Sequence, residues 1–169
     1  GVRTFFRQPL AMSGLFFMFL ALASVLSLIP VVGNLIALVL LPGITAGFMA
    51  ASREASEGRF PMPWVLITAF RQGKSTLQPI LALGAMYAVA IVLVMGASAL
   101  VDGGQFAQVY LIGGQLTTEL VKDDSFLMAA LLATVLYTPV SLLFWHAPAL
   151  VLWHGVTPAK SVFFSLIAC

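Results

Sequence analysis

The only two histidines of the chain lie in the segment FWHAPALVLWHG, residues 144–155, each directly after a tryptophan. Imidazole nitrogen is a common ligand of zinc and of haem iron. His146 and His154 are eight positions apart, which corresponds to about 800° of helix rotation and about 12 Å of rise, so they cannot bind the same metal ion. No cysteine or carboxylate lies nearby to complete a site. We therefore predict no metal and no cofactor. Trp145 and Trp153 are interpreted as anchors at the membrane surface, with hydrogen bonds inside a helix bundle as the alternative role for the histidines.

The composition is that of an integral membrane protein. Of 169 residues, 61% are hydrophobic and 8% are charged, with a mean hydropathy of +1.06, whereas soluble proteins contain roughly 25% charged residues. The formal net charge is +2 and the basic residues are scattered, which argues against nucleic acid as a partner. The chain starts without methionine and stops within an apolar run at Cys169, so we expect it to be part of a longer protein.

Four apolar stretches are long enough to cross a bilayer, whose hydrocarbon core of ~30 Å needs about 20 helical residues. The expected spans are residues 9–30, 33–52, 77–101 and 126–153. The fourth span could end near His146 or near His154, because Pro148 lies between them. The sequence predicts an all-α fold, a polytopic transmembrane helical bundle with cytoplasmic interfacial amphipathic helices, in which residues 1–169 form one domain.

The distribution of basic residues predicts the orientation of the spans. Seven of the eight fall on one side of the expected membrane, and only Lys122 falls on the other. Loops rich in lysine and arginine stay in the cytoplasm under the positive-inside rule. We therefore expect both ends of the chain in the cytoplasm and the loop of residues 102–125 outside.

Two shorter apolar segments on the predicted cytoplasmic side start with proline. Residues 61–72 carry Trp64, and Arg71 and Lys74 lie at their end. Residues 158–169 open similarly and contain two phenylalanines. Both patterns are typical of helices that lie in the membrane surface, with membrane lipids as their partners.

Small residues recur at four-residue intervals in two of the spans. Gly43, Gly47 and Ala51 share one face of the second span, and Gly84 and Ala88 share a face of the third. Such faces let helix backbones approach closely in membranes. We expect them to be buried in helix contacts within the protein, or in contacts with a partner subunit.

Prolines inside the spans predict kinks or breaks, because each removes a backbone hydrogen bond. These residues are Pro42, Pro139 and Pro148. In transporters such breaks line substrate sites. The neighbouring side chains here are Tyr137, Thr138 and Ser141, without a charged group, so an ordinary structural kink is the alternative interpretation.

No arrangement typical of catalysis is visible. Ser98 belongs to the outer end of the third span, whereas both histidines belong to the inner part of the fourth, roughly 20 Å away across the bilayer. Hydrogen bonding requires ~3 Å, so a serine–histidine pair is excluded. None of the spans carries a charged residue away from its ends, which disfavours an ion-coupled transporter. We predict that the chain is not an enzyme.

Two long segments carry a resemblance to a protein family. They are FFRQPLAMSGLFFMFLALASVLSLIPVVGNLIALVLLPGITAGFMAASREASEGR and YTPVSLLFWHAPALVLWHGVTPAKSVFFSLIAC. With the order of elements between them, they resemble an uncharacterised family of polytopic proteobacterial inner-membrane proteins. The chain is more distantly similar to the membrane domain that accompanies glycerophosphodiester phosphodiesterases. The resemblance implies a bacterial inner-membrane location and about two further spans beyond Cys169, and it supplies no catalytic residues.

Two functions follow as expectations. The leading one is a non-catalytic accessory or structural subunit that associates with other integral membrane subunits, because small-residue faces are present and ligand clusters are not. The alternative is a transporter or channel-like protein for a lipid-like or apolar solute, because of the prolines in the fourth span.

Overall fold

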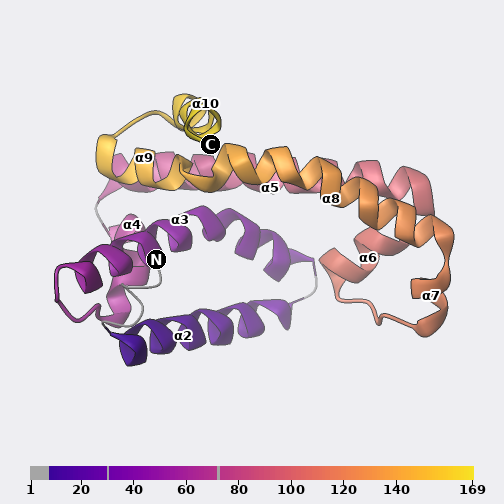
Figure 1. The fold of residues 1–169 in the computed structure, drawn as a ribbon, viewed down its shortest axis with the longest axis horizontal. Coiled ribbons are helices and arrows are strands. Elements are labelled where there is room, and N and C mark those ends of the chain that lie inside the picture. Colours follow the sequence, from indigo (N-terminus) through magenta and orange to yellow (C-terminus); the bar gives the residue numbers. More distant parts are fainter. Residues whose placement is uncertain (1–7, 30, 72) are drawn as a thin grey trace.

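The computed structural model describes residues 8–29, 31–71 and 73–169, which form helices and loops without a strand (Figure 1). Within these residues, four stretches are helical, apolar and long enough to cross a membrane. Three of them are single helices: α2 (Pro9–Ser27), α3 (Val32–Ser56) and α5 (Lys74–Asp102). The fourth consists of α8 (Asp124–Trp145) followed by α9 (Ala147–His154). The expected all-α, polytopic bundle is confirmed. The second span ends later than expected and the third begins earlier, because apolar helices continue into their polar flanks.

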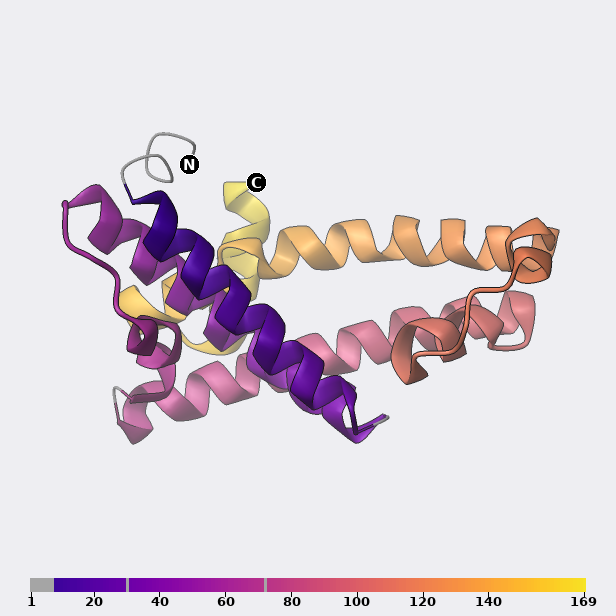
Figure 2. The same cartoon turned by 90° about the horizontal axis from the view of Figure 1, so that it is seen from below.

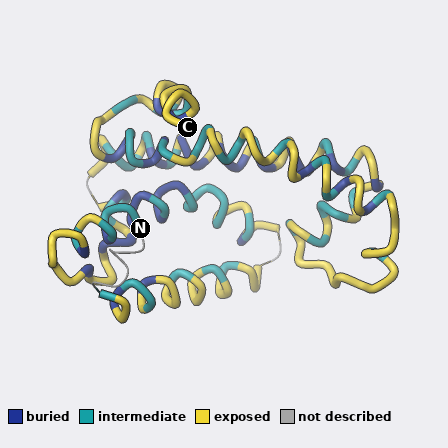
Figure 3. The backbone as a smooth tube through the Cα atoms, in the orientation of Figure 1, coloured by how far each residue is buried: buried dark blue, intermediate teal, exposed yellow. Residues whose placement is uncertain are grey.

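The spans form two antiparallel pairs that cross obliquely. α2 and α3 make a hairpin, and α5 and α8 make a longer pair that the hairpin crosses (Figure 2). α5 packs extensively on both α3 and α8, whereas α3 and α8 scarcely touch. Burial is concentrated on α3 and α5, while α2 buries only Ala11 and Leu15 (Figure 3). α5 is therefore the central helix of the fold.

Gly84 makes the close contact between α3 and α5. A Cβ atom at this position would collide with the backbone carbonyl of Val39 on α3. Ala88, one turn further along α5, is also buried. Because glycine has no side chain, the two backbones can approach to a distance that any larger residue would prevent.

The small-residue face of α3 packs against a short segment, where sequence alone suggested another helix. One interfacial helix was expected over residues 61–72. The described part of this range, residues 61–71, contains the 3-10 helix η1 (Pro63–Ile67) and a single turn, α4 (Thr68–Arg71). A Cβ on Gly47 would collide with the backbone of Leu66, and one on Gly43 would collide with the ring of Phe70. Ala51 is fully buried in a cluster that also contains Leu66 and Leu15.

Two short helices connect α5 to α8, namely α6 (Gln105–Ile112) and α7 (Thr118–Lys122). The carboxylate of Asp102 accepts hydrogen bonds from the N–H groups of Gly104 at 2.8 Å and Phe106 at 2.6 Å, which turns the chain into α6. The Asn34 side-chain amide donates to the carbonyl of Leu111, so the end of α6 meets the start of α3. Before α8, hydrogen bonds from the Ser125 hydroxyl and amide lower the pKa of Asp123.

The fourth span breaks near its C-terminal end. α8 stops at Trp145, His146 has φ −101° and ψ −12°, and α9 then begins. Pro148 lies in the first turn of α9, a position that proline favours because it has no N–H group to bond a carbonyl of the preceding turn. α3 and α8 continue through Pro42 and Pro139 without interruption. Of the three prolines, only Pro148 coincides with a helix break.

α10 (Pro158–Ala168) lies across this break (Figure 2). The N–H of His146 donates to Ser165 Oγ at 3.0 Å, and the Ser165 hydroxyl donates to the Leu142 carbonyl at 2.8 Å. A continuous α-helix would join these two backbone groups directly. The Ser165 hydroxyl is thus inserted into the hydrogen-bond ladder of the span, a known cause of helix bending, and it satisfies both separated groups.

Gly84→Ala tests the contact between α3 and α5. The new methyl group would force α5 away from the Val39 carbonyl, and we expect a loss of about 1–3 kcal/mol in the free energy of unfolding. Gly96→Ala on the same helix is the matched control, because a Cβ there meets nothing within 4 Å. Unfolding in mixed micelles measures both. Equal stability of the two variants would contradict the contact.

Ser165→Ala tests the inserted hydroxyl. Removing it leaves the His146 N–H without its partner and the Leu142 carbonyl with only the Cys169 thiol, at 3.7 Å, and we expect a loss of about 1–3 kcal/mol in the free energy of unfolding. The control is Ser161→Ala, because the Ser161 hydroxyl bonds only the Pro158 carbonyl of its own helix, at 2.7 Å. The same unfolding assay measures both variants. If Ser165→Ala and Ser161→Ala lower the free energy of unfolding equally, the inserted hydroxyl does not stabilise the break.

Candidate functional site

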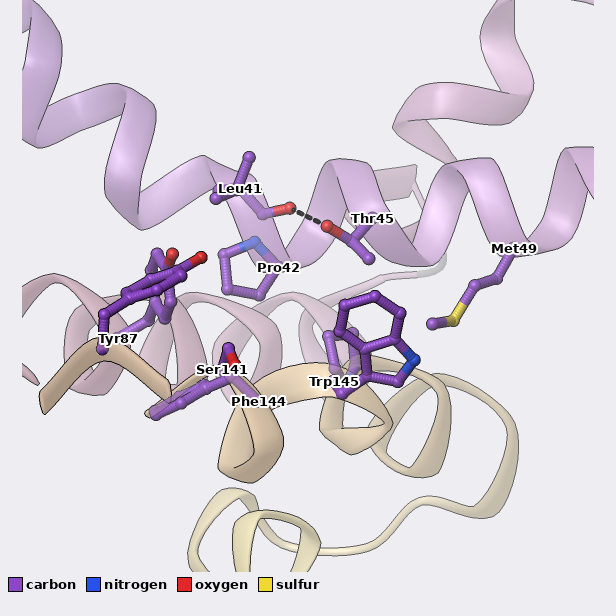
Figure 4. Close-up of a pocket in the computed structure, with 10 residues that line it drawn as sticks. Leu41, Pro42, Thr45, Met49, Tyr87, Ser141, Phe144 and Trp145 are labelled. Atoms are coloured by element: carbon purple, nitrogen blue, oxygen red, sulfur yellow. Dashed lines mark hydrogen bonds between the residues drawn. The ribbon is translucent and has the colours of Figure 1, made fainter. Parts of the chain in front are cut away.

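A groove lies between α3 and α8, with α5 as its floor. Two adjoining cavities, of about 270 Å³ and about 370 Å³, form it and share Leu41, Tyr87 and Tyr137. Pro42 on α3 and Trp145 on α8 approach the first cavity from opposite sides (Figure 4). The groove exists because α3 and α8 both pack on α5 and scarcely on each other.

Helix ends close the groove at both extremities. α9 packs on α3 and α5 at one end, and Pro148 in its first turn lines the first cavity. α6 packs on α5 and α8 at the other end, and Phe106 and Tyr110 line the second cavity. The helix break that Ser165 stabilises therefore determines the position of α9 at one end of the groove. The carboxylate of Asp102, which caps α6, positions α6 at the other end.

The lining is apolar and uncharged, with a few hydroxyl groups. The first cavity is lined by Leu41, Pro42, Thr45, Met49, Tyr87, Tyr137, Ser141, Phe144, Trp145 and Pro148. The second is lined by Leu38, Leu41, Tyr87, Ile91, Met95, Phe106, Tyr110, Ala133, Thr134 and Tyr137. A concave, mostly apolar site of this size with a few polar groups is typical of a small-molecule site.

All three aliphatic hydroxyl groups in the lining of the groove donate to carbonyls of their own helices. Thr45 donates to the Leu41 carbonyl at 2.9 Å (Figure 4). Ser141 donates to the Thr138 carbonyl at 2.7 Å. Thr134 likewise donates to the carbonyl of Ala130 at 2.8 Å. The remaining hydroxyl donors are those of the tyrosines, of which Tyr87 and Tyr137 line both cavities.

The predicted anchors lie in different surroundings. The guanidinium carbon of Arg53 is 5.9 Å from the centre of the Trp153 ring, a cation–π contact, and Arg53 also pairs with Glu57. Trp153 therefore sits beside the charged end of α3. Trp145 precedes the helix break and lines the groove instead. The two tryptophans are thus separated by the break.

The third tryptophan, Trp64, is 56% exposed and lines an apolar hollow between α2, α3 and η1. Arg71 and Lys74 flank the turn into α5, and neither forms an ion pair with another residue that the structure describes. Their interfacial role stays a prediction.

The structure brings together some of the predicted site residues and separates others. Pro42 and Pro148 line the groove, whereas Pro139 does not. The small residues of α3 face η1 and α4, away from the groove. Over the described ranges, no three His, Cys, Asp or Glu side chains gather in a cluster that could hold a metal ion.

Sequence reasoning missed two features of this region. Ser161, Ser165 and Cys169 follow one another at four-residue spacing, which marks one face of a helix. Two of them are fully buried against α8 and α9, and this spacing could have identified the packed face of α10. The positions of Tyr87 and Tyr110 opposite Tyr137 depend on tertiary packing and left no local signal.

A probable inner membrane protein of Burkholderia thailandensis is 41% identical to the chain over 172 residues. The match covers 100% of the chain and 64% of that relative, so the chain spans a little under two thirds of the relative's length. No protein-family model and no solved structure matches the chain. The similarity to the membrane domain that accompanies glycerophosphodiester phosphodiesterases stays a prediction. This relative and the membrane-length apolar helices identify the chain as an integral protein of the inner membrane.

Proposed function

We propose that this inner-membrane protein binds a lipid-like, largely apolar molecule in the groove between α3 and α8, for transport or for presentation to another protein. The observation that carries the proposal is the groove itself, which lies beside membrane-spanning helices and has an uncharged lining. An apolar molecule dissolved in the bilayer could enter from the side, between α3 and α8.

The lining supports binding in preference to bond chemistry. Its side chains are aliphatic, aromatic or hydroxyl-bearing, so the groove offers no group that titrates near neutral pH. General acid–base catalysis depends on such a group. The proposed activity is therefore non-catalytic.

A second candidate is the accessory-subunit role, which the exposure of α2 favours. α2 packs chiefly on α3 and buries two side chains, and Phe17 is 66% exposed on its outer surface. Either lipid or a transmembrane helix of another subunit can cover this surface. Purification in a mild detergent with a quantitative inventory of associated proteins tests it, and a monomer without a reproducible partner counts against it.

Ser141→Phe tests the groove. The larger ring would occupy the first cavity, and we expect the occupancy of the bound molecule to fall about tenfold or more, since overpacking costs about 1–3 kcal/mol. Leu131→Phe, at a 57% exposed position of the same helix, is the matched control. Native mass spectrometry of protein taken from the membrane, followed by lipid extraction, reports the bound species. The proposal fails if the wild type carries only the bulk lipid mixture.

The orientation is also a proposal, with both ends of the chain in the cytoplasm. It is supported by the basic residues near the C-terminal end of α3 and at the start of α5. In a Cys169→Ser background, Phe60→Cys should resist a membrane-impermeant thiol reagent in intact spheroplasts, whereas Gln115→Cys should react. Both positions are exposed in loops. The reverse pattern would invert the topology.

A further inference from the structure

All three tyrosines of the chain converge on the groove. Tyr87 comes from α5, Tyr110 from α6 and Tyr137 from α8, and together they line the second cavity. Tyr87 and Tyr137 also line the first cavity, so their side chains lie where the two cavities join. Segments far apart in the sequence thus contribute the same chemical group to one place.

This tyrosine pair lies deep in the membrane-spanning region. Tyr87 is near the middle of the 29-residue α5, about 20 Å from either end. Burial of a hydroxyl in an apolar environment is costly unless it has a hydrogen-bond partner. The pair holds two hydroxyl protons, and a bond from one hydroxyl to the other would use only one of them. One donor remains for a molecule in the groove.

The depth and charge of the site determine which head group fits. A phosphate or ammonium group would have to leave water and sit near the bilayer centre, and the lining offers no opposite charge to compensate. The occupant therefore has an uncharged head group that accepts a hydrogen bond. A carbonyl oxygen has this chemistry.

The shape of the first cavity favours a flat head group. Tyr87 and Phe144 form an edge-to-face pair with ring centroids 5.2 Å apart, and Trp145 and Pro148 also line this cavity. Aromatic rings pack well against other planar rings, by offset stacking or edge to face. The second cavity adds Leu38, Ile91 and Met95, which suit an apolar tail.

We propose that the groove binds a prenylated quinone, with its ring in the first cavity, a ring carbonyl accepting a hydrogen bond from the Tyr87–Tyr137 pair, and its tail along the second cavity. The proposal rests on the proposed binding function and specifies its ligand class. It involves binding alone and no electron transfer.

Trp145 provides the readout, because it lines the cavity that would hold the ring and quinones quench tryptophan fluorescence. The test uses the chain in lipid nanodiscs with Trp64→Phe and Trp153→Phe, which leaves Trp145 as the sole tryptophan, titrated with decylubiquinone. The matched control retains only Trp64, which lies on the other side of α3. We expect saturable quenching of Trp145 and a linear, collisional response from Trp64.

The tyrosine hydroxyls are tested by Tyr87→Phe and Tyr137→Phe, which keep the rings. Each change should raise the half-saturating quinone fraction by about 2- to 10-fold, the effect of one lost hydrogen bond. Dioleoylglycerol, which has carbonyls but no ring, and dioleoylphosphatidylglycerol, which is charged, should compete at least about tenfold less well.

Linear quenching of Trp145, equal competition by either glycerolipid, or unchanged affinity in both phenylalanine variants would each overturn the quinone assignment. These outcomes are separable from failure of the proposed function. If native mass spectrometry still finds a specific molecule that Ser141→Phe removes, the groove binds a ligand of another class.

Discussion

The insertion of the Ser165 hydroxyl between His146 and Leu142 is the interaction on which the end of the bundle around α9 and α10 depends. A polar backbone group inside a membrane must be bonded, so a spanning helix breaks only where something else serves its separated N–H and carbonyl groups. One side chain of α10, that of Ser165, forms both of these hydrogen bonds. The break then lets α9 pack on α3, brings Trp153 to Arg53, and leaves Trp145 and Pro148 in the wall of the groove.

The same constraint explains why the groove has so few available polar groups. Thr45, Thr134 and Ser141 each donate to a carbonyl of their own helix, so these hydroxyls add little polarity to the lining. Tyrosine differs because its hydroxyl stands too far from its own backbone to do this. Where three tyrosines from separate helices line one uncharged groove, they supply hydroxyl donors that are not bonded to the carbonyls of their own helices. The fold thus combines an apolar site with a few hydroxyl groups that can form directional hydrogen bonds.

Much of the fold follows from the sequence, because spanning a bilayer imposes length and hydropathy on each helix. The spans were predictable for this reason, and so was a disturbance near Pro148. The partners of the helix faces were not. Gly43 and Gly47 predict that another segment packs closely on this face of α3. They do not predict that this segment is η1 and α4, because a face of small residues can accept any backbone segment that reaches it. The groove also escaped prediction, since it depends on α3 and α8 both packing on α5.

The central claim is that the space between α3 and α8 is a ligand site and not ordinary lipid-facing surface. The most direct measurement is a high-resolution cryo-EM structure of the protein in nanodiscs made with its native membrane lipids. The account predicts one ordered, elongated molecule in the groove, with its head group against Tyr87 and Tyr137 and its tail toward Met95. A groove filled by protein side chains, or one that holds only disordered acyl chains like those around α2, would contradict it.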